Sequence, residues 1–141
     1  MATTGISTLD HAPQVVAEWL NELCDDLGWQ EKPRAYLLLH ETLHAIRDLL
    51  GVDEAAELAA QLPILVRGIY FEGWNPSGTP STARSKAELL DRIAGRFSKQ
   101  PLDDTERAVA AVFDLLRRHV SPGELDQVRK SMRKPIRELW D

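Results

Sequence analysis

Several features that would direct a chain to a membrane or to an oxidising compartment are scarce or missing from this sequence. The 141 residues include one cysteine, Cys24, so no internal disulfide can form. No apolar run approaches the roughly 18–20 residues that a membrane-spanning helix needs, and the first residues, MATTGISTLDH, lack the basic and apolar regions of a signal peptide. We therefore expect a cytoplasmic protein with no membrane partner, in which Cys24 is a buried structural thiol.

The sequence also lacks the pattern of a β-strand, since no stretch alternates apolar and polar residues with a period of two. Apolar residues recur instead at spacings of three and four, which keeps them on one face of a helix. The clearest such stripe consists of Tyr36, Leu39, Leu43, Ile46 and Leu50. The pattern predicts an all-α fold with helices at about 13–28, 34–50, 53–72, 84–98, 103–120 and 122–139.

Residues with the preferences of helix ends stand close to these boundaries. Pro13 and Pro33 suit the first turn of a helix, and Gly28 and Gly51 suit the residue that ends one. A capping side chain followed three residues later by a carboxylate satisfies the free amides of the first turn. Three such pairs are expected to open helices: Ser85 with Glu88, Asp103 with Glu106, and Ser121 with Glu124.

The apolar pattern of the second half repeats that of the first at a constant offset of 70 residues, without a gap. Few matches are identities; these are Arg47 with Arg117, Glu54 with Glu124, and Arg67 with Arg137. Internal repeats specify architecture, so we expect a tandem duplication of a three-helix unit, packed around a shared core as one six-helix, bundle-like domain. The first repeat would span 1–72, a linker rich in glycine, proline and serine 73–83, and the second repeat 84–141.

Charge is distributed unequally between the halves. Residues 1–78 carry 4 Lys/Arg and 12 Asp/Glu, whereas residues 79–141 carry 13 and 10, and the whole chain has a net charge of −5. Such asymmetry can mark a binding surface. Three interpretations stay open: the repeats attract each other, molecules associate head to tail, or the two halves simply present differently solvated faces.

The segment His40-Glu41-Thr42-Leu43-His44 matches the HExxH pattern of zinc metalloproteases. On a helix, histidines four residues apart project from one face and can hold one metal ion. At about 100° per residue, however, both histidines fall at the edge of the apolar stripe and Glu41 points to solvent. We therefore expect solvated histidines and no cofactor. A zinc site at His40 and His44 is kept as the alternative.

The segment from Arg67 to Pro76 holds three of the nine aromatic residues of the chain within ten positions. A rigid aromatic group beside an arginine and a carboxylate makes a good contact for a partner or small ligand. An aromatic plug that closes the junction of the two repeats would use the same residues, and we favour it. The candidate interaction residues are Arg67, Tyr70, Phe71, Glu72 and Trp74.

The same region carries a longer signature, which includes Leu62-Pro63, Val66-Arg67-Gly68 and Tyr70-Phe71-Glu72-Gly73-Trp74. On these motifs, and on the ending Ile136-Arg137-Glu138-Leu139-Trp140, the chain resembles a bacterial family known only as domain of unknown function 2267. The resemblance implies an all-helical cytosolic protein with no established activity, and it supplies no catalytic residues. The second half departs from the pattern at Met132-Arg133, where Leu-Pro would be expected. Pro63 is expected to kink the third helix.

The last expected helix presents a broad basic face, formed by Arg129, Lys130, Arg133, Lys134 and Arg137. Such a face could contact nucleic-acid phosphates. The net charge of −5 and the absence of aromatic residues among the basic ones disfavour nucleic acid. We favour an acidic protein partner or the acidic first repeat as the group that this face attracts.

Together these features predict a non-enzymatic helical protein that acts as a protein-interaction or regulatory module, with a protein partner or a second copy of itself. The first alternative is a metal-binding protein or metal-dependent enzyme that uses His40 and His44. The second is a nucleic-acid binder that uses the basic last helix.

Overall fold

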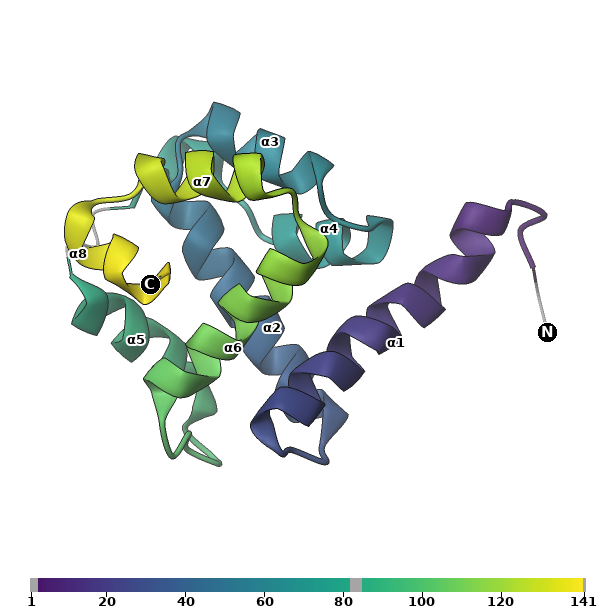
Figure 1. The fold of residues 1–141 in the computed structure, drawn as a ribbon, viewed down its shortest axis with the longest axis horizontal. Helices are drawn as coiled ribbons and strands as arrows, with labels where there is room; N and C mark the ends of the chain where they lie inside the picture. Colours follow the sequence, from purple (N-terminus) through teal and green to yellow (C-terminus); the bar gives the residue numbers. More distant parts are fainter. Residues whose placement is uncertain (1–2, 82–84, 141) are drawn as a thin grey trace.

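The chain folds as an assembly of helices, shown in Figure 1, in which the computed structural model describes residues 3–81 and 85–140. The all-α prediction is confirmed, and no strand is found within those two ranges. The α-helices are α1 Ser7–Leu27, α2 Lys32–Leu49, α3 Val52–Ala60, α4 Ile64–Phe71, α5 Lys86–Ala94, α6 Thr105–His119, α7 Pro122–Ser131 and α8 Lys134–Arg137. Three short 3₁₀ turns are η1 Pro76–Gly78, η2 Gly95–Phe97 and η3 Glu138–Trp140.

The described residues thus contain eight α-helices where six were expected, because two of the expected helices are each broken in two. The helix expected at 53–72 ends at Ala60, and Pro63, in an extended conformation, precedes α4. The helix expected at 122–139 ends at Ser131, and α8 carries Pro135 in its first turn. Proline has no N–H to donate to the carbonyl four residues earlier, so a continuous helix through either site would lose a hydrogen bond and clash.

Helix α1 begins at Ser7, one and a half turns before the expected start, so Pro13 lies inside the helix and not at its first turn. The N-terminal end is held by Asp10, whose carboxylate accepts hydrogen bonds from the backbone N–H of Thr4 at 2.8 Å and its hydroxyl at 2.9 Å. Pro13 costs the helix one backbone hydrogen bond and leaves it continuous. Gly28 ends α1 in the left-handed conformation, with φ of 69°, as expected.

The other helix ends agree with the sequence in part. Ser85 and Ser121 accept hydrogen bonds from the amides three residues later, which confirms two of the three expected caps. The third cap is Asp104 and not Asp103, since its carboxylate accepts from the amide of Arg107 at 3.1 Å. Gly51 is extended, with φ of −67°, and precedes α3 instead of ending α2 in the left-handed conformation.

The centre of the fold is the contact between α2 and α6, which carry many of the fully buried side chains. Helix α1 packs on both α2 and α6, and α5 also packs on both. Helix α3 packs on α7, across the top of Figure 1. The end of each half closes on its own central helix, because α4 packs on α2 and η3 packs on α6. Cys24 lies buried in this core, as expected.

Five ion pairs join acidic side chains of the first half to basic side chains of the second. Arg118 on α6 binds Glu22 at 2.9 Å and Asp26 at 2.8 Å on α1, and His119 binds Glu22 at 2.8 Å. On the other side of α2, Arg92 binds Asp48 at 2.7 Å, and Arg96 binds Glu41 at 2.8 Å. The unequal charges of the halves therefore attract each other within one molecule.

The N-terminal half of α1 projects beyond the rest of the helices (Figure 1). Of the expected linker, 73–83, the structure describes residues 73–81, which contain η1; residues 82 and 83 lie outside the described residues. The outer residues of the two expected repeats, 1–2, 84 and 141, lie outside them as well. Among the described helices, none has both the length and the apolar character to cross a membrane.

Candidate functional site

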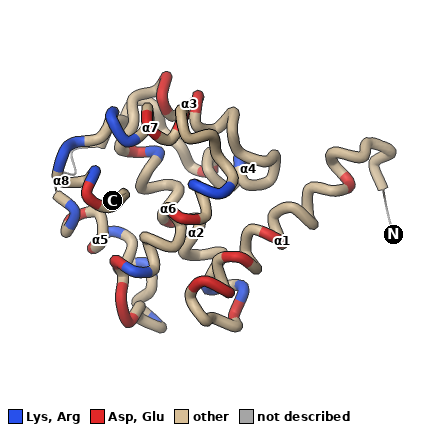
Figure 2. The backbone as a smooth tube through the Cα atoms, viewed as in Figure 1, with Lys and Arg blue, Asp and Glu red and all other residues tan. Residues whose placement is uncertain are grey.

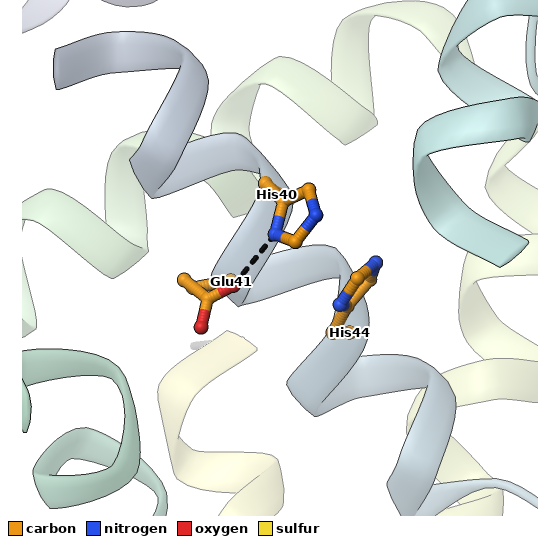
Figure 3. Close-up of side chains that lie close together, drawn as sticks. All are labelled: His40, Glu41 and His44. Atoms are coloured by element: carbon orange, nitrogen blue, oxygen red, sulfur yellow. Dashed lines mark hydrogen bonds and ion pairs between the residues drawn. The ribbon is translucent and has the colours of Figure 1, made fainter. Parts of the chain in front are cut away.

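His40, Glu41 and His44 lie together on α2, in a crowded region and not at a solvated edge (Figure 3). His44 is buried, and the side chains of His40 and Glu41 are only 18% and 14% exposed. The expectations that the histidines are solvated and that Glu41 faces solvent were therefore wrong. Helix α4 and helix α5 both pack on α2. Their contacts enclose sides of α2 that a helical wheel of α2 alone assigns to solvent.

The ring of His40 lies between two carboxylates. Its Nδ1 is 2.6 Å from Oε2 of Glu41, and its Nε2 is 3.0 Å from Oε1 of Glu72, just after α4. The other oxygen of Glu41 accepts a hydrogen bond from Nε of Arg96 at 2.8 Å. The hydrogen bond from His40 lowers the pKa of the exposed Glu72 carboxyl. Side chains from α2, the end of α4 and η2 thus meet at one place.

His44 is held in one tautomer by the backbone of α4. Its Nε2 lies 2.7 Å from the carbonyl oxygen of Ile69, and since a carbonyl can only accept, Nε2 carries the proton. Burial lowers the pKa of His44, so the ring is neutral at pH 7 and Nδ1 keeps a free lone pair. The two imidazole rings are 4.0 Å apart between centroids. One ligand atom from each of His40, Glu41 and His44 lies within 4.8 Å of the other two.

Arg47, one turn beyond His44, is a buried arginine that the sequence analysis did not select. Its Nη1 donates to the carbonyls of Tyr70 at 2.8 Å and Glu72 at 2.9 Å, and its Nε donates to Asp48 at 2.8 Å. Together with His44 it binds three carbonyls at the end of α4. The identity of Arg47 with Arg117 was the available signal, because Arg117 donates to the carbonyl of Trp140, the residue matched with Tyr70.

Asp48 extends this network from α2 to α5. One oxygen accepts from Arg47, and the other accepts from Arg92 at 2.7 Å. Burial alone would raise the pKa of Asp48, but the hydrogen bonds from the two arginines lower it below its usual value. The carboxylate is therefore ionised at neutral pH and joins two helices.

The structure places the five candidate interaction residues in different environments. Arg67 donates to the carbonyls of Ala59 at 2.9 Å and Leu62 at 3.0 Å, so it bridges the break between α3 and α4. Tyr70 is fully buried, and its hydroxyl donates to the carbonyl of Ala55 at 2.9 Å. Both of these side chains contact the protein itself, so they are poorly placed to meet a partner.

The other three candidates lie nearer to the surface. Phe71 and Trp74 are half-buried, with ring centroids 5.2 Å apart, and both pack against the core. The indole Nε1 of Trp74 is buried without a hydrogen-bond partner among the described residues. Glu72 is exposed, and its carboxylate contacts His40. Of the five candidates, Glu72 is thus the one that the structure brings to the histidines.

The expected basic face is divided between two helices, because Arg129 and Lys130 lie on α7 and Lys134 and Arg137 on α8. Arg133 lies between the helices. Lys130, Arg133 and Lys134 are exposed, whereas Arg129 and Arg137 are partly buried. Lys130 pairs with Asp126 on its own helix at 2.8 Å. A continuous basic stripe on one straight helix is therefore absent from the described part of this region.

An apolar groove that the sequence analysis missed lies between the projecting end of α1 and the start of α4. It measures about 800 Å³, and it is lined mainly by Ala12 and Val15 on one side and by Pro63 and Ile64 on the other. Leu9 and Ile64 are 38% and 44% exposed. Leu9 lies seven residues before Val16, which packs on the core, and this spacing on one helical face was the signal available in the sequence.

Comparison with known families gives one match. The model of the family DUF2267, described as an uncharacterized conserved protein, matches residues 16–139. This confirms the resemblance seen in the sequence. A comparison with curated proteins finds no match. The projecting first turns of α1 precede the matched range.

Proposed function

Since the chain belongs to DUF2267, a family of uncharacterized conserved proteins, we propose from its own surface that it is a non-enzymatic interaction module that associates with a second copy of itself. The proposed contact surface is the projecting N-terminal half of α1 together with the groove beside it. The observation that carries the proposal is the apolar stripe of α1, which continues beyond the part of the helix that the core covers.

The stripe runs along one face of α1 at helical spacing. Leu23 is fully buried, Leu20 and Val16 are partly buried against the core, and Leu9 lies further along the same face with much of its surface exposed. An apolar face that extends past its own core is typical of a surface that a partner covers.

The groove supplies the complementary surface. Ile64 and Leu65, at the start of α4, are both more than 40% exposed, and Pro63 and Ile64 form one wall of the groove. Large exposed apolar side chains on two neighbouring helices make a larger continuous patch than either helix would alone.

A second copy of the chain is the occupant that fits the charges. Residues 3–21 contain two acidic side chains and no lysine or arginine, and one of the two, Asp10, is engaged by Thr4 (Figure 2). Two copies of this segment can therefore approach with little like-charge repulsion, in contrast to the rest of the acidic first half. In a contact with twofold symmetry, each molecule would offer both the helix and the groove.

Light scattering coupled to size-exclusion chromatography tests the proposal. We expect a dimer whose fraction rises with protein concentration and persists at high salt, since an apolar contact is not screened. Leu9→Glu and Ile64→Glu should each give a monomer. Val52→Glu is the matched control, because Val52 is equally exposed but lies on α3 outside the groove, and it should leave the dimer unchanged. A wild-type chain that is monomeric at every concentration would refute the proposal.

We further propose that the fold is a tandem duplication sharing one core, with units 1–72 and 84–141 joined by the linker 73–83. Contacts that exchange the halves support it: α1 with α6 corresponds to α5 with α2, and α4 with α2 corresponds to η3 with α6. The hydrogen bonds of Arg47 to the Tyr70 carbonyl and of Arg117 to the Trp140 carbonyl also correspond at the offset of 70 residues. Each unit then has four helical segments in place of the expected three.

A further inference from the structure

We propose that His40, Glu41 and His44, completed by Glu72, form a binding site for a divalent transition-metal ion of the zinc class. The proposal is independent of self-association, because these residues lie outside the groove between α1 and α4. The site is built by two consecutive turns of α2 and by the residue that follows α4.

The first support is the composition and closeness of the cluster. Two imidazoles and a carboxylate present ligand atoms within 4.8 Å of one another. Two ligands about 2.1 Å from the same ion can be at most about 4.2 Å apart, so rotations of the side chains by a few tenths of an ångström suffice to close the set. Imidazole nitrogen with carboxylate oxygen favours zinc and neighbouring transition metals, whereas magnesium and calcium favour oxygen alone.

The second support is the orientation of His44. A histidine that binds a metal through one nitrogen commonly donates the other N–H to a carbonyl or carboxylate, which fixes the ring and its tautomer. His44 has this arrangement, since Nε2 donates to the carbonyl of Ile69 and Nδ1 has no hydrogen bond within the described residues. The lone pair of Nδ1 is therefore available to an ion.

The third support is the placement of the carboxylates around His40. A carboxylate oxygen lies within 3.0 Å of each ring nitrogen, Glu41 at Nδ1 and Glu72 at Nε2. Whichever nitrogen binds the ion, an anionic ligand is thus already beside it. Glu41 is itself held by Arg96, in the position that an outer partner of a metal ligand occupies.

Glu72 gives the site the means to reach four ligands. Its side chain is 67% exposed, so it can move toward the ion without disturbing the core. Its backbone carbonyl is fixed by Arg47 at 2.9 Å, which keeps the residue beside α2. A bound ion would then link α2 to the end of α4.

Isothermal titration of the full chain, free of any histidine tag, with Zn²⁺ tests the site, and Mg²⁺ serves as the comparison ion. We expect one Zn²⁺ per chain and no binding of Mg²⁺. Loss of an outer partner weakens metal sites by about 10–100-fold, so His40→Gln and His44→Gln should each weaken Zn²⁺ binding by at least about 100-fold. Glu72→Gln should weaken it by about tenfold, and visible absorption of the Co²⁺ complex should change with each variant.

The control is the double variant His11→Gln with His119→Gln, which removes the two histidines outside the cluster and should keep full affinity. Because His44 is buried, circular dichroism must show that His44→Gln is folded; if it is not, His40→Gln and Glu72→Gln decide the question. The proposal is refuted if the wild-type chain binds no Zn²⁺, if both of those variants keep full affinity, or if the control double variant loses it.

Discussion

Replacement of Arg47 by methionine is expected to destabilise the protein more than any other single change to a charged residue of α2. The guanidinium is nearly inaccessible, with 5% of the side chain exposed, and it donates to the carbonyls of Tyr70 and Glu72 and to the carboxylate of Asp48. Methionine keeps most of the apolar stem, so the change removes the three hydrogen bonds and leaves only a small cavity.

The magnitude follows from the groups that would be left unpaired. A hydrogen bond to a charged group contributes about 1.5–3 kcal/mol, and removal of one partner from a buried ion pair costs about 3–5 kcal/mol. Asp48 keeps its bond to Arg92, which offsets part of the loss. We therefore expect a loss of about 3–4 kcal/mol in the free energy of unfolding. At about 2–4 °C per kcal/mol for a chain of this size, Tm should fall by roughly 10 °C.

The second half of the chain provides the control. Arg117 occupies the matched position and donates to the carbonyl of Trp140, but its side chain is 43% exposed and its carboxylate partner Asp114 is also exposed. Water can replace these contacts, so Arg117→Met should cost about 1 kcal/mol or less. Urea unfolding followed by circular dichroism measures both variants. The reasoning fails if the two variants lose equal stability, or if Arg47→Met loses less than about 1 kcal/mol.

Two further predictions concern Asp48 and Trp74. The pKa of Asp48 is lowered in the folded chain from its usual 3.8, so its ionised form stabilises the fold above that pH, and the contribution is lost as the pH falls below it. Asp48→Asn should therefore cost about 2 kcal/mol at pH 7 and progressively less below about pH 4, measured by urea unfolding across this range; a cost independent of pH would contradict the assignment. Trp74 is half-buried against Phe71, so Trp74→Ala should cost about 2 kcal/mol, somewhat less than the cost of emptying a fully buried aromatic site. A thermal melt that is unchanged within error would show that Trp74 does not close the seam after α4.

The candidate site shows which parts of a site can be predicted from sequence. The fixed geometry of a helix places residues four apart on one face, so the spacing of His40 and His44 is enough to pair them. Glu72 and the carbonyl of Ile69 come from a segment more than twenty residues away, and no local rule brings them to His40 and His44. The wheel of α2 also assumed one buried face, whereas α2 is packed by α1, α4, α5 and α6.

The sequence by itself determined the helical class, the positions of most helices and several of their ends. These features depend on spacing within one turn, on the capping oxygens of Ser85 and Ser121, and on the freedom of Gly28 to adopt a left-handed conformation. Only the tertiary structure decided that Arg47 is buried at the end of α4, that Glu41 is enclosed by α5 and its following turn, and that α1 extends past the core. Burial depends on which helices meet across the chain, and that is set by the packing of whole faces and not by the residues within any one helix.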